Sequence, residues 1–205
     1  MCGIAALVYG DDAAAPADAT RAVLEFATRC GLERRGPDGL DAAVPAPRVA
    51  LAASVLRMRR ADDWRQPVVD GRGNALAWNG EWFGGDGAPP AGAGDTAAVA
   101  AVLGAAVAGL ADAADAAAAV AAVLAGRVRG PYAVAFYAAD ARALLFCRDP
   151  LGPGRDKRAK FPTSKAPISA VFHSFRLIFG RAIISRNGLE AWMFLLERAR
   201  AEQSR

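Results

Sequence analysis

Histidine is almost absent from this chain of 205 residues, since His173 is the only one. It lies in the last 55 residues, whose composition differs from that of the rest of the chain, so we do not expect a Cys–His catalytic pair. Cysteine is scarce as well, and three cysteines cannot all pair, so a complete disulfide framework is excluded. We interpret Cys30 and Cys147 as small buried hydrophobic residues and His173 as a surface residue. We expect neither a metal site nor a cofactor.

Long uninterrupted apolar runs are also missing. The stretch 97–125 comes nearest, but Asp112 and Asp115 interrupt it. Each of these aspartates would cost about 2.5–3.5 kcal/mol at the centre of a bilayer. We therefore expect a pair of helices here and no contact with a membrane. The first residues lack the basic flank and the cleavage-like site of a secretory signal, so we expect a reducing, cytoplasmic location.

Positive charge is distributed unevenly along the chain. Residues 1–150 hold 14 Lys and Arg against 17 Asp and Glu, a net charge of −3, whereas residues 151–205 hold 11 against 4, a net charge of +7. The second part also holds every lysine and five of the six serines. We predict a domain over 2–152 and an atypical basic tail over 153–205, which we interpret as the product of a truncated or mis-spliced gene or of a shifted reading frame. Five phenylalanines in the tail disfavour a solvated arm that binds nucleic acid, so we expect no nucleic-acid partner.

Hydrophobic patterns predict strands at both ends of the first 150 residues and helices between them. This order favours an α+β layered domain. A Gly- and Pro-rich loop without periodicity is expected over 84–94, and Asn79-Gly80 is expected to end a strand. The predicted strands are Gly3–Tyr9, Val49–Met58, Ala75–Trp78, Tyr132–Tyr137 and Ala143–Cys147, and the predicted helices are Ala19–Cys30 with Asp18 as its cap, an alanine-rich pair beginning at Asp95 or Thr96, and Gly188–Gln203 in the tail.

Cys2 is the most informative residue present. It directly follows Met1, so removal of Met1 would leave one residue with both a thiol and a free amine. A free cysteine has a pKa near ~8.5, so a nucleophilic thiol needs a base beside it. An α-amine has a pKa of roughly 7.7–8.0 and can accept the thiol proton directly or through one water. We therefore predict that Cys2 is a nucleophile that carries its own base; the alternative is that it only follows the start codon.

Other residues meet the further needs of amide cleavage. Attack by a thiolate creates an oxyanion, which the side-chain amide of Asn79 and the backbone N–H of Gly80 can stabilise. An amino-acid substrate needs an acidic partner for its ammonium group, for which Asp95 and Glu81 are candidates, and a basic partner for its carboxylate, for which Arg57 is the candidate. Simpler interpretations stay open, because Asn-Gly is a common turn pair and an aspartate often caps a helix.

Six short motifs follow one another along residues 2–152. They are Met1-Cys2-Gly3-Ile4, Arg35-Gly36-Pro37-Asp38-Gly39, Gln66-Pro67, Trp78-Asn79-Gly80-Glu81, Gly94-Asp95-Thr96, and Arg129-Gly130-Pro131 leading to Arg148-Asp149-Pro150-Leu151-Gly152. This series resembles the class II glutamine amidotransferases, and among them the glutaminase domain of asparagine synthetases. It is most similar to the asparagine synthetase domain-containing proteins of eukaryotes.

The resemblance implies an N-terminal nucleophile hydrolase fold, a four-layer αββα sandwich. It also implies hydrolysis of L-glutamine to glutamate and ammonia in asparagine biosynthesis. Cys2 would be the nucleophile and its own amine the base, while Asn79 and Gly80 would form the oxyanion hole. Glu81 and Asp95 would bind the amino group of the substrate.

The basic partner of the substrate carboxylate is the least certain of these assignments. Family members have an arginine on the strand that ends near Arg57, but Arg59 and Arg60 follow closely. A slip of one residue turns a strand side chain to the other face of the sheet. Arg57, Arg59 and Arg60 therefore all stay candidates.

The sequence departs from the family after Gly152. The strands that complete the sandwich and the synthetase domain with its Ser-Gly-Gly phosphate loop are not expected here. We therefore predict that the sandwich is incomplete at its C-terminal end, and that any acceptor of the ammonia is a separate synthetase domain. A silent interaction module that keeps the fold, or an amidase for a different amide, are the alternatives.

Overall fold

The computed structural model describes residues 2–9, 17–58, 65–90 and 93–149 and the backbone of two further strands, 168–172 and 191–195. This part of the chain contains three α-helices, one short 3₁₀ helix and nine strands. In chain order these elements are β1 (Gly3–Val8), α1 (Ala19–Arg29), the 3₁₀ helix (Leu32–Arg34), β2 (Gly39–Ala46), β3 (Val49–Val55), β4 (Val68–Val69), β5 (Ala75–Gly80), α2 (Asp95–Ala106), α3 (Ala113–Arg127), β6 (Tyr132–Ala138), β7 (Ala143–Arg148), β8 (Ile168–Phe172) and β9 (Ala191–Leu195).

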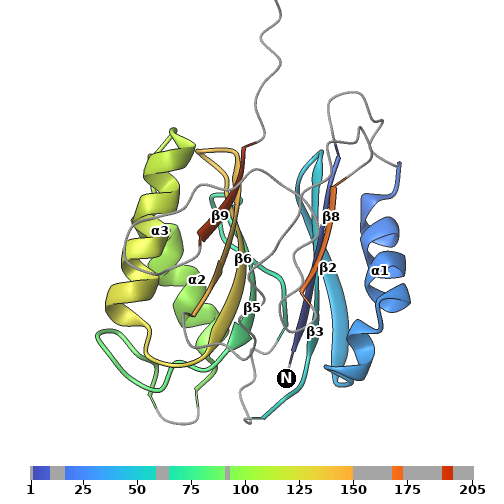
Figure 1. Cartoon of the computed structure of the whole chain (residues 1–205), viewed down its shortest axis with the longest axis horizontal. Helices are drawn as coiled ribbons and strands as arrows, with labels where there is room; N and C mark the ends of the chain where they lie inside the picture. Colours follow the sequence, from blue (N-terminus) through green and yellow to red (C-terminus); the bar gives the residue numbers. More distant parts are fainter. Residues whose placement is uncertain are drawn as a thin grey trace, which may run out of the picture.

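The strands form two antiparallel sheets, and helices cover their outer faces (Figure 1). One sheet has the order β2-β3-β1-β8 and lies against α1. The other has the order β4-β5-β6-β7-β9 and lies against α2 and α3. The fold is therefore of the α+β class, as predicted, with its elements in layers.

Alternation along the strands divides the core into three hydrophobic layers. Ile4 and Ala6 of β1 belong to the layer between the two sheets, together with Ala75 and Ala77 of β5. The intervening residues of β1 belong to the layer under α1, and Leu76 of β5 to the layer under α2 and α3. Since successive side chains of a strand point to opposite faces, this pattern fixes which residues look into the space between the sheets.

Aspartate side chains cap two of the helices, and the first of these caps was predicted from the sequence. Asp18 Oδ1 accepts a hydrogen bond from the backbone N–H of Arg21 at 2.8 Å, at the start of α1. Asp112 Oδ1 accepts from Ala114 N at 2.8 Å and from Asp115 N at 3.0 Å, which starts α3. The predicted helix pair is thus confirmed. Within the described ranges, no helix has both the length and the apolar character needed to cross a membrane.

Several predicted elements differ from the structure. The sequence analysis missed β2, and it ended β5 two residues too early, because Asn79 and Gly80 still pair with Ala133 and Tyr132 of β6. The predicted helix over 188–203 is wrong at its centre, where β9 pairs with β7. The tail also supplies β8, which pairs with β1, so strands do extend both sheets after residue 152. The other residues of the tail lie outside the described ranges.

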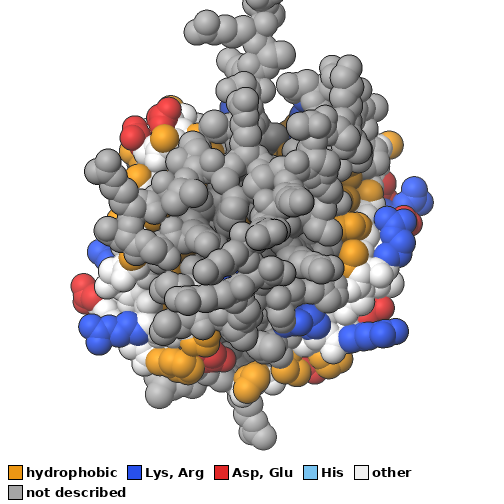
Figure 2. All heavy atoms as spheres, in the orientation of Figure 1, with side chains coloured by type: hydrophobic (Ala, Val, Ile, Leu, Met, Phe, Trp, Pro, Cys, Tyr) orange, Lys and Arg blue, Asp and Glu red, His pale blue; other side chains and the backbone are white. Residues whose placement is uncertain are grey.

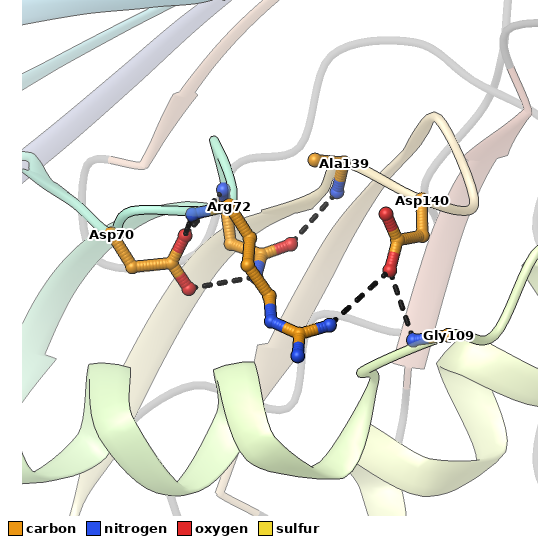
Figure 3. A network of polar contacts seen from close by, with 6 residues as sticks. Asp70, Arg72, Gly109, Ala139 and Asp140 are labelled. Atoms are coloured by element: carbon orange, nitrogen blue, oxygen red, sulfur yellow. Dashed lines mark hydrogen bonds and ion pairs between the residues drawn. The ribbon is translucent and has the colours of Figure 1, made fainter.

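A polar network joins three turns at the end of the second sheet (Figure 3). The buried Asn74 donates from Nδ2 to Asp70 Oδ2 at 2.7 Å and accepts at Oδ1 from the backbone N–H of Ala139 at 2.8 Å. Asp140 accepts from the N–H of Gly109 at 2.9 Å. Asn74 therefore ties the turn before β5 to the turn between β6 and β7.

We expect Asn74→Ala to lower the free energy of unfolding by about 2–4 kcal/mol, because it leaves two polar groups without partners. Arg72→Ala is the matched control: Arg72 is exposed and its ion pair with Asp140 spans 4.0 Å, so a change within about 0.5 kcal/mol is expected. Urea unfolding measures both. Equal stability of the Asn74 variant and the unsubstituted protein would contradict this role.

Candidate active site

Cys2 lies at the start of β1, where three neighbours contact it or the residue after it. The backbone N–H of Leu56 approaches Cys2 Sγ at 3.5 Å. Arg35 Nε donates to the carbonyl oxygen of Cys2 at 3.5 Å. The N–H of Gly3 donates to Ser54 Oγ at 3.0 Å. The thiol is thus next to a backbone donor, in a half-buried position.

The alternation of side chains along β1 places the side chain of Cys2 on the face of its sheet that looks toward the other sheet. Ile4 and Ala6 face the layer between the sheets, so Cys2, two residues before Ile4, continues the same side. β1 contacts β5 and β6 of the opposite sheet. In Figure 1 the N-terminus and the tip of β5 both lie at the lower end of the sandwich. Cys2 and the end of β5 therefore share one end of the molecule.

The end of β5 presents Asn79 and Gly80. Asn79 has the same parity as Ala75 and Ala77, so its side chain belongs to the inner side of the sheet. Gly80 pairs with Tyr132 without room for a side chain, because a Cβ there would lie 2.7 Å from the Pro131 oxygen. Glycine is therefore required at this position for steric reasons.

The backbone N–H of Gly80 points away from β6. Both backbone groups of Tyr132, its register partner, bond instead to Asp149: Tyr132 N donates to Asp149 Oδ2 and Asp149 N donates to Tyr132 O, each at 3.1 Å. Along β5, Trp78 N donates to Gln66 Oε1 at 2.6 Å on the opposite edge, and the N–H of Gly80 has the same direction. β4 covers this edge only at Ala75 and Leu76. In the described part of the chain, the Gly80 N–H is left available to an oxyanion.

Two carboxylates lie beside this strand end. Glu81 is half-buried directly after Gly80, and its N–H donates to the Pro131 oxygen at 3.0 Å. Asp95, buried at the start of α2, accepts from the N–H of Trp82 at 2.8 Å. This bond holds the residues after β5 against α2. The interpretation of Asp95 as a simple helix cap is therefore wrong. Its carboxylate accepts from a residue outside α2, and Gly94 is the N-cap of that helix.

Arg57 is exposed just beyond the end of β3. Its N–H donates to Asp38 Oδ2 at 2.7 Å, and the N–H of Asp38 donates to the Val55 oxygen at 3.0 Å. The Arg35–Gly39 motif is in this way fixed to the end of β3, next to Cys2. Arg59 and Arg60, the alternative partners of a substrate carboxylate, lie outside the described residues, as does His173.

The other two cysteines have different surroundings. All three cysteines are free thiols. Burial raises the pKa of Cys147 to about 12, and burial also raises the pKa of the half-buried Cys30. Cys147 is a buried hydrophobic residue, as predicted, whereas Cys30 is only partly covered. Among the residues that the structure describes, no group of three His, Cys, Asp or Glu side chains is placed to hold a metal ion.

Sequence reasoning missed three contributors to this site: Ser54, Leu56 and Gln66. Leu56 acts through its backbone N–H, which no side-chain motif reports. Gln66 belongs to a motif, but the motif does not show its role. Its side-chain oxygen accepts a hydrogen bond from the backbone N–H of Trp78, where a neighbouring strand would otherwise supply the acceptor. The described part of the face seen in Figure 2 carries arginine side chains and Asp and Glu side chains around its rim.

No model of a known protein family matches the chain, and no curated protein matches it either.

Proposed function

We propose that this chain is a glutaminase domain that hydrolyses L-glutamine to glutamate and ammonia. The observation that supports this most is the shared position of two groups at one end of the sandwich. Cys2 directly precedes β1 and has a backbone donor at its sulfur, and Asn79 and Gly80 end β5 on the facing sheet with an available N–H. A nucleophile and an oxyanion hole are the minimum that amide cleavage requires.

The layered architecture is a second observation that supports the proposal. Two antiparallel sheets are packed face to face, with α1 on one side and α2 and α3 on the other (Figure 1), and this order of layers agrees with the αββα sandwich that an N-terminal nucleophile hydrolase would have. The tail strands β8 and β9 lie at the edges of these sheets. We propose this fold for the domain over 2–152, extended by the tail.

The first chemical step is acylation. After removal of Met1, the α-amine of Cys2 accepts the proton of its thiol, and the sulfur attacks the side-chain amide carbon of glutamine. The negative charge on the amide oxygen is stabilised by Asn79 Nδ2 and the N–H of Gly80. The C–N bond then breaks, the α-ammonium returns the proton to the leaving nitrogen, and ammonia departs from a thioester on Cys2.

The second step is deacylation. The free α-amine removes a proton from water, and the oxygen attacks the thioester carbon in the same oxyanion hole. The C–S bond breaks, the sulfur takes the proton back and glutamate leaves. Neither step needs a histidine, a metal or a cofactor.

Glu81 and Asp95 bind the ammonium group of the substrate in this proposal, and Arg57 binds its carboxylate. Asp95 accepts from the N–H of Trp82, the residue after Glu81, and this bond holds Asp95 beside the end of β5. The ammonia would pass to a separate synthetase domain for asparagine biosynthesis in the cytoplasm.

The direct test is incubation of the purified protein with L-glutamine, followed by measurement of ammonia and of the amino acid that is formed. L-Asparagine, which is one methylene shorter, and D-glutamine are the matched controls. Glutamate from L-glutamine alone is the expected result. No product from any amide would favour a silent module, and faster cleavage of another amide would favour a different amidase.

Asp95→Asn should raise the KM for L-glutamine by about 10- to 100-fold and change kcat much less, because it removes the charge that faces the ammonium group. Asparagine keeps an oxygen for the N–H of Trp82, so the fold is retained. Asp95→Ala loses both interactions and is the comparison for stability. An unchanged KM in the asparagine variant would contradict the assigned role.

A further inference from the structure

The nucleophile has little covalent support. Once Met1 is removed, Cys2 is joined to the protein only through its peptide bond to Gly3. Chain ends are mobile unless other contacts hold them. The direction of both the thiol and the amine therefore depends on noncovalent contacts around this one peptide.

Of the three contacts made with Cys2 and Gly3 that were described above, the one made by Ser54 is the shortest and the most enclosed. Ser54 Oγ accepts from the N–H of Gly3 at 3.0 Å, against 3.5 Å for the contacts of Arg35 and Leu56. Ser54 is fully buried, with no exposed surface. It is also the only serine in the first 150 residues.

A hydroxyl group is unexpected at this place in the fold. The other residues of β3, Val49 to Val55, are all apolar, and Ser54 lies on the side of the strand that faces α1 and the 3₁₀ helix. Burying a hydroxyl is unfavourable unless it is hydrogen-bonded. The N–H of Gly3 is the partner that compensates for its burial.

The packing around this bond leaves no space for a side chain at Gly3. A Cβ on Gly3 would lie 2.8 Å from Ser54 Oγ and 2.9 Å from Leu32 Cγ. The backbone at Gly3 is therefore pressed against the hydroxyl and the leucine together. A movement of this peptide would carry Cys2 with it.

We infer that Ser54 is a positioning residue for the nucleophile, whose hydroxyl oxygen fixes the Cys2–Gly3 peptide and thereby the direction of the thiol. This inference rests on the proposed function of Cys2. Ser54 faces away from the space between the sheets, so it does not touch the substrate. Its loss should change the chemical step and leave substrate binding intact.

The test compares Ser54→Ala with Val23→Ala. Val23 is a buried residue of α1 in the same hydrophobic layer, so its truncation weakens the fold from the face of the sheet opposite to Cys2. We expect Ser54→Ala to lower kcat about 10- to 100-fold and to leave KM for L-glutamine within about twofold. We expect Val23→Ala to keep kcat within about twofold at a similar loss of stability in urea unfolding. Ser54→Thr, which retains the hydroxyl, should recover most of the kcat.

Amide exchange at Gly3, followed by NMR, separates this inference from the proposed function. In Ser54→Ala the Gly3 amide should exchange at least about tenfold faster than in Val23→Ala, whether or not glutamine is hydrolysed. A protein without glutaminase activity but with this faster exchange would overturn the proposed function alone. Equal Gly3 exchange in the two variants, or an equal loss of kcat in both, would overturn the role of Ser54.

Discussion

Cys2→Ala will abolish glutamate formation, with a fall in kcat of at least about 10³-fold. No other thiol can replace Cys2, because Cys147 is buried and burial raises the pKa of both Cys147 and Cys30. The half-buried side chain of Cys2 contributes little to packing, so the urea midpoint should change little. Glutamate release and urea unfolding, measured on the same preparation, check the two halves of this expectation.

Cys30→Ala is the matched control for that substitution. It removes a half-buried thiol at the end of α1, distant from the start of β1 in the sequence and outside the proposed chemistry. Its kcat should equal that of the unsubstituted protein. Activity that survives in Cys2→Ala, or that is lost equally in Cys30→Ala, would show that the nucleophile has been assigned to the wrong residue.

Asn79→Ala will lower kcat by about 10²- to 10³-fold, the usual effect of removing one oxyanion-hole donor. KM should change little, because the donor acts on charge that forms in the transition state. Asn79→Asp should lose as much or more, since it keeps the size of the side chain and removes the N–H donors. Steady-state kinetics with L-glutamine measure both variants.

The control for this second prediction is Phe83→Ala. Phe83 follows the same strand end, but its side chain is 70% exposed, so kcat should stay within about twofold. An Asn79→Asp variant with nearly full activity would mean that Asn79 serves the pairing of β5 with β6 and not the oxyanion.

Elements with strong local signals could be predicted from the sequence. Asp18 marks the start of α1, and the β6–β7 hairpin follows two apolar runs. β2 was missed because this edge strand is only half-buried and contains Pro45, so its apolar pattern is weak.

At two places the structure that tertiary contacts stabilise differs from the one that the local sequence favours. Asn79-Gly80 has the composition of a turn, yet β6 pairs with both residues, so β5 continues through them. The segment around β9 has a helical apolar pattern, yet it lies along the open edge of β7. Strand pairing with a preformed edge overrides intrinsic helix preference in such cases.

The residues of the candidate site also fall into those that could be predicted from the sequence and those that could not. Cys2, Asn79, Gly80, Glu81 and Asp95 could be named because their chemistry is in their side chains or in glycine itself. The contacts of Ser54 and Leu56 with the start of β1 depend on the register of β3 against β1, which joins residues more than 50 positions apart. No motif of neighbouring residues reports such a register.

The proposed chemistry depends on a Cys2 that is both N-terminal and reactive. The most direct measurement is treatment of the native protein with a diazoketone analogue of glutamine, followed by peptide mass spectrometry. We expect one equivalent of label on a peptide that begins at Cys2, protection by L-glutamine, and no label on Cys30 or Cys147. A peptide that still begins at Met1, or label spread over all three cysteines, would contradict the account.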